Sequence, residues 1–206
     1  TMLYDIHRHE WDEGLLALFN IPAAILPEVH DNAHIFGETD AAFTGRSLPI
    51  AGMAGDQQAA LIGQRCFAPG MAKSTYGTGC FLLANIGDTP ILSANRLLTS
   101  PAYKIGNEAA YALEGSIFIA GAAIKWLRDT LGIIASAEET AQLAACVPDD
   151  HGVHLIPAFV GLGAPHWRSD VRAAITGMTL DTGPAHFARA ALEAAAFQTG
   201  DLLDAI

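Results

Sequence analysis

The stretch that decides the fold is "AKSTYGTGCFLLANIG", residues 72–87. Its Thr, Tyr, Phe and Leu residues favour extended strands, and the glycines near its centre favour a tight turn. We therefore expect two strands around the turn Gly77-Thr78-Gly79. Glycines on both sides of a threonine let main-chain N–H groups approach a ligand, and the hydroxyl adds a donor. Spacing alone also fits an ordinary hairpin turn, so both interpretations stay open.

On the N-terminal side of this hairpin lies a single acid in "AGDQQAALIGQ", residues 54–64. The short apolar run "LPIAGMA" (48–54) predicts a strand, and a helix is expected over about 57–65. Asp56 thus falls at a strand-to-helix turn. An Asp at such a turn commonly serves as a helix N-cap, and a functional carboxylate would fit the same position.

The rest of the chain alternates between strand and helix patterns. Thr182 or Gly183 as the cap, with Pro184 in the first turn, predicts where the last helix begins. This order of elements predicts an α/β protein, with a candidate domain boundary at "FAPGM" (67–71). The further strands are expected at 2–6, 97–104, 109–114 and 153–159, and the further helices at 12–19, 118–133 and 137–146.

Composition narrows the possible functions. The chain has 206 residues, of which 51% are hydrophobic and 16% charged, so it can bury a sizeable core. Its formal charge of -11 would repel a phosphate backbone, so we expect no nucleic-acid partner. No apolar run approaches the roughly 18 residues of a membrane span, and three cysteines without CxxC spacing predict single buried thiols in a reducing compartment. We expect a cytoplasmic protein.

Both ends of the chain carry secondary-structure patterns. "TMLYDI" alternates like a half-buried strand at the start, and a long helical pattern runs into Ile206 without a Gly or Asn stop. These patterns lead us to expect an internal segment of a longer protein.

Several familiar motifs are incomplete. His7, His9, His151 and His154 have no acid or Cys partners at the usual spacing of a zinc site. The pair Gly77-x-Gly79 lacks the third glycine of a dinucleotide fingerprint, as does the pair at 161 and 163. The sequence contains neither a GxxxxGK[ST] P-loop nor a GxSxG elbow. A bound phosphate would need another main-chain device.

Five stretches, taken together and in order, resemble the FGGY carbohydrate kinases. The Asp-Gln-Gln form with "TYGTGCF" is similar to the branch that phosphorylates glycerol. The resemblance covers essentially the whole chain. The stretches are "GDQQAALIGQ" (55–64), "KSTYGTGCFLL" (73–83), "YALEGSIFIAGAAIKWLRD" (111–129), "PAFVGLGAPHW" (157–167), and the spaced pair "AITGM" (174–178) and "HFARAALE" (186–193).

The resemblance implies a partial actin-like, ribonuclease H-like ATPase fold, in which two domains close over a cleft. Residues 1–66 would be the end of the N-terminal, glycerol-binding domain, and residues 67–206 the first part of the C-terminal, nucleotide-binding domain. It also implies ATP-dependent phosphorylation of glycerol with ATP and Mg²⁺, and a homo-oligomer for the full-length enzyme. This segment alone is expected to be catalytically incomplete.

The resemblance further implies roles for single residues. Asp56 would be the general base that takes the proton of the attacking hydroxyl, and Gln57 would hydrogen-bond the polyol. Phe81 would form an apolar wall against the carbon chain of glycerol. The implied nucleotide contacts are Gly77, Thr78, Gly121 and Lys125.

Two departures from the family pattern stand out. Position 125 is commonly Gln in the family and is Lys125 here, which leaves an exposed helix lysine as the alternative. The family's Tyr-Trp-Asp is replaced by His166, Trp167 and Arg168. Two other functions stay open: another sugar kinase of the family, acting on xylulose or gluconate, and a non-catalytic actin-like binding module.

Overall fold

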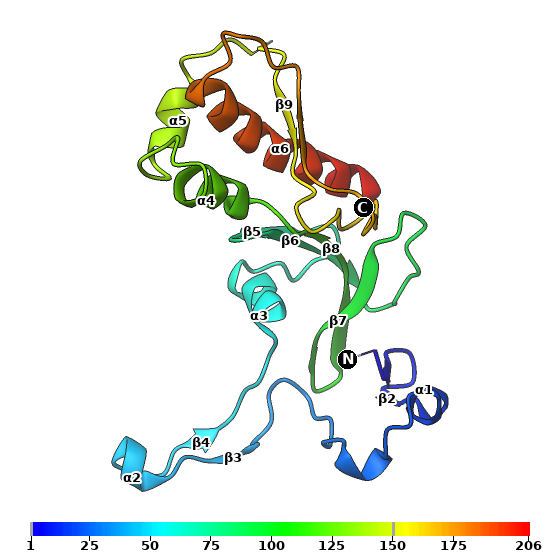
Figure 1. Cartoon of the computed structure of the whole chain (residues 1–206). Coiled ribbons are helices and arrows are strands. Elements are labelled where there is room, and N and C mark those ends of the chain that lie inside the picture. The colour runs from blue at the N-terminus through cyan, green and yellow to red at the C-terminus, as the bar shows by residue number, and fades with distance from the viewer. Residues whose placement is uncertain (1, 150) are drawn as a thin grey trace. The chain divides into compact units, whose positions relative to one another are not determined.

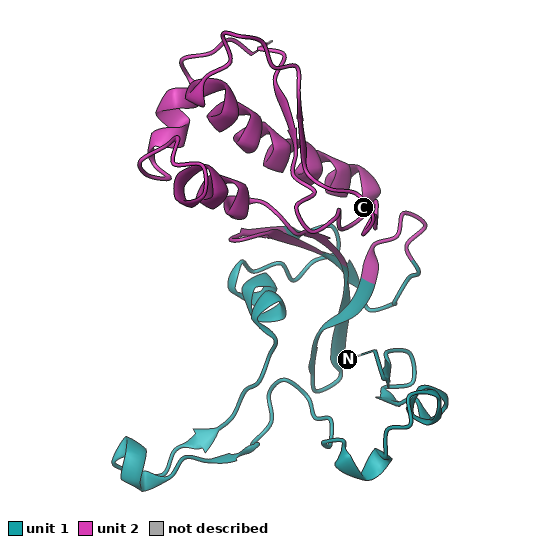
Figure 2. Ribbon diagram, viewed as in Figure 1, with its two compact units in different colours: residues 1–72, 84–92, 99–113 teal, residues 73–83, 93–98, 114–206 magenta. Residues whose placement is uncertain are grey.

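The computed structural model describes residues 2–149 and 151–206, and the chain divides into two compact units (Figure 2). Unit 1 comprises Thr1–Ala72, Ala84–Leu92 and Thr99–Leu113, and unit 2 comprises Lys73–Leu83, Ser93–Leu98 and Glu114–Ile206. Helices and strands are mixed along the chain, in agreement with the predicted α/β class (Figure 1). The elements are β1 (Tyr4–Asp5), β2 (Glu10–Trp11), α1 (Glu13–Leu18), the 3₁₀ helix η1 (Ala23–Ile25), β3 (Gly37–Glu38), α2 (Ala41–Thr44), β4 (Pro49–Ile50), α3 (Asp56–Gly63), β5 (Ala72–Tyr76), β6 (Cys80–Gly87), β7 (Leu98–Ile105), β8 (Glu108–Ile117), α4 (Gly121–Asp129), α5 (Glu139–Ala144), β9 (His154–Ile156), β10 (Ala174–Thr176) and α6 (Pro184–Ala205).

Unit 1 contains short elements whose ends are fixed by capping side chains. Asp12 caps α1 by accepting a hydrogen bond from the Leu15 N–H at 2.8 Å. In the β3–β4 hairpin, Asp40 caps the four-residue helix α2 in the same way, and Gly45 ends it in a left-handed conformation with φ of 76°. Four residues are too few for a periodic pattern, so the sequence alone does not indicate this helix.

The start of α3 contradicts one of the two interpretations of Asp56. The N-cap is Gly55, and Asp56 is the first residue inside the helix. The N-cap interpretation of Asp56 is therefore wrong. A carboxylate in the first turn is still favourable, because the N-terminus of a helix carries partial positive charge.

The strands β5 to β8 form one four-stranded sheet in the order β5-β6-β8-β7 (Figure 1). The two strands expected around the turn at residues 77–79 are confirmed as β5 and β6. The predicted strand at 48–54 is reduced to the two residues of β4, which pairs with β3 in a two-stranded sheet.

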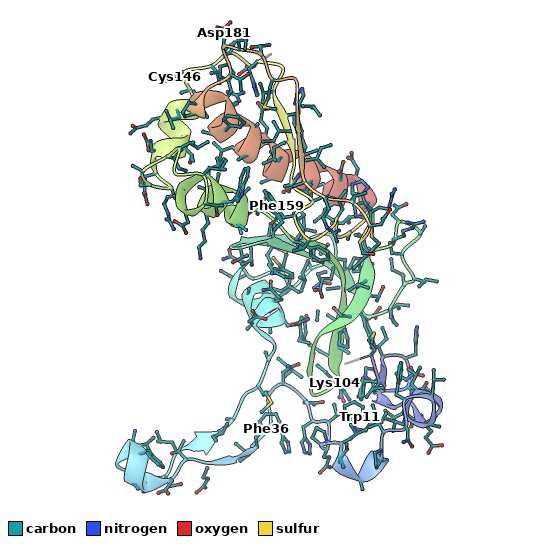
Figure 3. The ribbon with its side chains drawn as sticks, in the orientation of Figure 1. Trp11, Phe36, Lys104, Cys146, Phe159 and Asp181 are labelled. Carbon is teal, nitrogen blue, oxygen red and sulfur yellow. The ribbon has the colours of Figure 1, made fainter. Side chains whose placement is uncertain are left out.

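Unit 2 packs α4, α5 and α6 with the β9–β10 pair. A core of small and aliphatic side chains joins them, and its alanines on α6 let neighbouring elements approach closely. Phe159, labelled in Figure 3, meets Trp126 of α4 edge-on, with ring centroids 5.0 Å apart. The buried members of this core are Ala123, Leu127, Ile134, Val153, Leu155, Ala190, Ala191 and Ala194.

The first and last residues of the helices in unit 2 can be compared with those predicted from the sequence. The last helix begins at Pro184 with Gly183 as its N-cap, as predicted. The helix expected at 118–133 spans only Gly121–Asp129, so that prediction is too long at both ends. β10 was not predicted, because its pairing with β9 joins segments about 20 residues apart.

Two glycines allow the main chain of the β5–β6 turn to lie directly against the junction of β8 and α4. A Cβ atom added at Gly79 would overlap the carbonyl oxygen of Ile117. One added at Gly121 would lie 2.5 Å from the carbonyl oxygen of Gly77. This contact also explains why α4 begins at Gly121, because the residues before Gly121 lie along the β5–β6 turn.

We expect Gly79→Ala to lower the free energy of unfolding by about 1–3 kcal/mol, because a methyl group there forces the main chain apart. The matched control is Gly200→Ala, since a Cβ at Gly200 within α6 meets nothing within 4 Å. The control should gain about 0.5–1 kcal/mol from helix propensity. Urea denaturation of both variants measures the difference, and unchanged stability of Gly79→Ala would contradict the close contact.

Candidate active site

The β5–β6 turn is held by hydrogen bonds from the first residues of α4. The carbonyl oxygen of Thr78 accepts from the N–H groups of Ala120 at 2.8 Å and Ala122 at 3.0 Å. The carbonyl oxygen of Gly77 accepts from the N–H of Gly121 at 3.0 Å. The first N–H groups of α4 are thus already paired, so the start of this helix is tied to the turn.

The hydrogen-bond donors of Thr78 are its main-chain N–H and its hydroxyl group. Thr78 is exposed, and in the part of the chain that the structure describes neither its N–H nor its hydroxyl donates a hydrogen bond. A main-chain N–H and a hydroxyl beside a helix N-terminus suit an anionic group such as a phosphate. The sequence-predicted nucleotide residues Gly77, Thr78 and Gly121 therefore lie together, with Thr78 carrying the donors.

Lys125 lies one helical turn after Gly121 on α4, and its side chain is exposed. The pKa of Asp129 is below its ordinary value, mainly because Arg128 donates a hydrogen bond to it and in smaller part because of the charge of Lys125. The Lys125 ammonium group is thus weakly attracted to Asp129. To contact a ligand near the start of α4, it would have to give up this attraction.

Phe81 lies on β6 with 37% of its surface exposed. Its carbonyl oxygen accepts a hydrogen bond from the Nζ of Lys73 at 3.2 Å, and the same ammonium donates to the Thr75 hydroxyl at 3.0 Å. An aromatic ring that is partly exposed on a strand can cover an apolar ligand surface. Lys73 is the residue here that sequence reasoning missed, because nothing in its neighbourhood in the sequence predicts its burial.

Asp56 and Gln57 belong to unit 1, whereas the five other predicted site residues belong to unit 2. The Asp56 carboxylate accepts hydrogen bonds from the main-chain N–H of Gln57 at 2.9 Å and from its Nε2 at 3.3 Å. Asp56 is exposed. The carboxylate is therefore held at the start of α3 by its neighbour and remains accessible to a hydroxyl group.

The segment His166-Trp167-Arg168, in which the first and third residues depart from the family pattern, makes contacts within unit 2. His166 pairs with Asp201 of α6 at 3.0 Å, and the Trp167 indole donates to the carbonyl oxygen of Arg96 at 2.7 Å. Arg168 donates two hydrogen bonds of 2.8 Å to Asp170. These contacts tie the loop after β9 to α6 and to the segment before β7.

Three further observations bear on cofactors and environment. No group of three or more His, Cys, Asp or Glu side chains that could hold a metal ion occurs within residues 2–149 and 151–206. No described helix has both the length and the apolar character needed to cross a membrane. Cys66 and Cys80 are buried free thiols as expected, but Cys146 is exposed, because it follows the short surface helix α5.

Comparison with known proteins identifies the class. Residues 72–206 match the C-terminal domain of the "FGGY family of carbohydrate kinases", and residues 1–63 match its N-terminal domain. The chain therefore belongs to the FGGY family of carbohydrate kinases. It has part of the actin-like, ribonuclease H-like ATPase fold.

Within this family the similarity is to glycerol kinases. The chain is 60% identical over 206 residues to the glycerol kinase of Gluconobacter oxydans, covering 100% of this chain and 40% of that protein. The glycerol kinase of Xanthobacter autotrophicus is also 60% identical over the whole chain, which covers 41% of it. The chain thus spans about two fifths of the length of these relatives.

Solved structures give the same fold. The crystal structure of Plasmodium falciparum glycerol kinase with ADP matches with a TM-score of 0.88 and 41% identity, over 100% of this chain and 41% of that chain. A xylulose kinase from Brucella ovis matches with a TM-score of 0.80 over 96% of this chain and 41% of that chain. At 22% identity, the second match shows the fold alone.

The loop after β9 provides a test by titration. The hydrogen bonds from Arg168 hold the pKa of Asp170 at about 2. We expect Arg168→Gln to raise this pKa toward the ordinary value of about 4. Because the pKa is lowered in the folded state, the stability from this pair is present above the unfolded-state value and is lost as the pH falls through about 2.

NMR titration of the Asp170 carboxyl carbon measures the shift directly. Arg172→Gln is the matched control, because Arg172 contributes least to lowering the pKa of Asp170. An equal pKa change in both variants would show that general positive charge, rather than the Arg168 hydrogen bonds, sets the value.

Proposed function

We propose that these residues are part of an ATP-dependent glycerol kinase, which transfers a phosphoryl group from ATP to glycerol and forms glycerol 3-phosphate. The observation that carries the proposal is the 60% identity to glycerol kinases along the whole chain. The accessible Asp56 carboxylate and the Thr78 donors support it, because they match two needs of phosphoryl transfer.

The proposed domain division follows the sequence. Residues 1–66 would belong to the glycerol-binding domain and residues 67–206 to the nucleotide-binding domain. Asp56 and Gln57 then act on the alcohol, and the turn at residues 77–79 acts on the nucleotide.

In the proposed mechanism, Asp56 is the general base. Its carboxylate takes the proton of the attacking glycerol hydroxyl as the new O–P bond forms and the bond between the γ-phosphoryl group and ADP breaks. Gln57 offers both a donor and an acceptor, which suits neutral hydroxyl groups. The 2.9 Å hydrogen bond from the Gln57 N–H to Asp56 orients the carboxylate.

On the nucleotide side, we propose that Thr78 donates to phosphate oxygens while Gly77 and Gly121 keep the main chain close enough for this contact. Lys125 would reach the nucleotide from the next turn of α4. ATP supplies the phosphoryl group when bound. Mg²⁺ usually binds through waters, substrate phosphates and one or two carboxylates. The described residues do not form an all-protein cage for the ion, so we assign no step to it and propose that it accompanies ATP.

Phe81 would cover the carbon chain of glycerol. Its ring is exposed enough to be touched by a ligand, and a three-carbon polyol offers a small apolar surface to it.

We also propose that the complete enzyme contains polypeptide beyond these 206 residues. Large apolar side chains of α6 support this, because Phe197 is 62% exposed and Leu203 is 57% exposed. The 206-residue chain by itself is then incomplete as a catalyst.

The role of Asp56 is tested by Asp56→Asn in the complete enzyme. We expect kcat to fall at least about 100-fold, because an amide cannot accept the proton of the hydroxyl. The affinity for glycerol should change much less, since the amide still hydrogen-bonds a hydroxyl. Steady-state kinetics and calorimetry with glycerol measure the two effects.

The matched control is Asp12→Asn. Asp12 is the N-cap of α1, and Asn is an equally good N-cap, so this variant should keep both kcat and stability. If Asp56→Asn also keeps its kcat, Asp56 is not the base.

The role of Lys125 is tested by Lys125→Gln, which restores the residue common in the family. If Lys125 contacts the nucleotide, the KM for ATP should change at least about threefold, while the KM for glycerol stays nearly constant. Initial rates with each substrate varied in turn give both constants. Unchanged constants would leave Lys125 as an exposed helix residue.

A further inference from the structure

Lys73 is the buried lysine of this chain. Its relative exposure is 5%, although lysine is almost never fully buried unless its charge has partners. The other two lysines, Lys104 and Lys125, are exposed, and Lys104 (labelled in Figure 3) pairs with Asp31 at 3.6 Å. The position of Lys73 on β5 therefore needs a separate explanation.

The ammonium group of Lys73 joins the two strands of the β5–β6 hairpin. It donates to the Thr75 hydroxyl on its own strand at 3.0 Å and to the Phe81 carbonyl oxygen on β6 at 3.2 Å. A second contact between the strands, 3.0 Å between the Ser74 hydroxyl and the Cys80 thiol, lies next to it. The side chain thus fixes the main chain of Phe81 relative to the strand that leads into the turn.

Stability alone does not account for this arrangement. A buried cation must give up its hydration, and its hydrogen bonds offset this cost only in part. What the charged hydrogen bonds provide is a fixed geometry, because each holds a defined donor and acceptor in place.

We propose that Lys73 is a positioning residue for glycerol, which holds Phe81 in the place where its ring covers the carbon chain of the substrate. The proposal rests on the proposed glycerol kinase activity. Lys73 acts through Phe81 and does not itself touch the substrate. Loss of its ammonium group would let β6 shift at Phe81 while the contacts of Thr78 with α4, which involve other atoms, remain.

The test is Lys73→Met in the complete enzyme, since Met keeps the length of the side chain and removes the ammonium group. We expect the KM for glycerol to rise at least about threefold and the KM for ATP to stay within about twofold. The matched control is Lys104→Met, which removes an exposed lysine and should change neither constant.

Hydrogen exchange provides a measure that does not depend on activity. Main-chain amides of residues 80–83 should exchange faster in Lys73→Met than in the wild type, because the hydrogen bonds by which Lys73 joins the two strands are lost. If Lys73→Met does not fold, Thr75→Val removes the hydroxyl that accepts from Lys73 and should also raise the KM for glycerol.

The outcomes separate the two proposals. If the wild-type enzyme does not phosphorylate glycerol, the proposed function is wrong, and so is the substrate role of Lys73. If the wild type is active but the variant shows an unchanged KM for glycerol, an equal rise in both KM values, or unchanged exchange at residues 80–83, the positioning role of Lys73 is wrong while the proposed function stands.

Discussion

The contact between the β5–β6 turn and the β8–α4 junction is the constraint on which the proposed nucleotide-binding residues depend. Main chain meets main chain there, and no side chain larger than hydrogen fits at Gly79 or Gly121. The N–H groups at the start of α4 then bond to the carbonyl oxygens of the turn. As a result, Thr78 is held at the turn through its carbonyl oxygen, which accepts from Ala120 and Ala122.

This arrangement modifies the usual account of a helix N-terminus as an anion site. The first N–H groups of α4 donate to protein carbonyl oxygens, so few of them remain to bind an anion. The dipole of the helix still acts on its surroundings. In the proposed nucleotide site the donors would then come from the turn, and Thr78 would supply them. Lys125, exposed one turn further along, would add the charge that the paired amides do not carry.

The sequence predicted the elements that local patterns determine. The hairpin around residues 77–79 and the start of α6 at Pro184 follow from turn and cap chemistry that is readable within a few residues. The start of α4, the burial of Lys73 and the strand β10 depend on segments distant in the sequence, and no local pattern encodes such contacts. Asp56 shows both cases: the helix expected after it is present, but the N-cap is Gly55 and the strand expected before it is reduced to Pro49–Ile50.

We propose that the enzyme containing this chain phosphorylates glycerol with ATP. The most direct measurement is ³¹P NMR of the complete protein with Mg-ATP and glycerol, xylulose or gluconate in parallel. The account predicts a glycerol 3-phosphate resonance that grows in step with ADP in the glycerol sample alone. Phosphorylation of xylulose or gluconate in preference to glycerol, or binding of glycerol and ATP without any product, would contradict it.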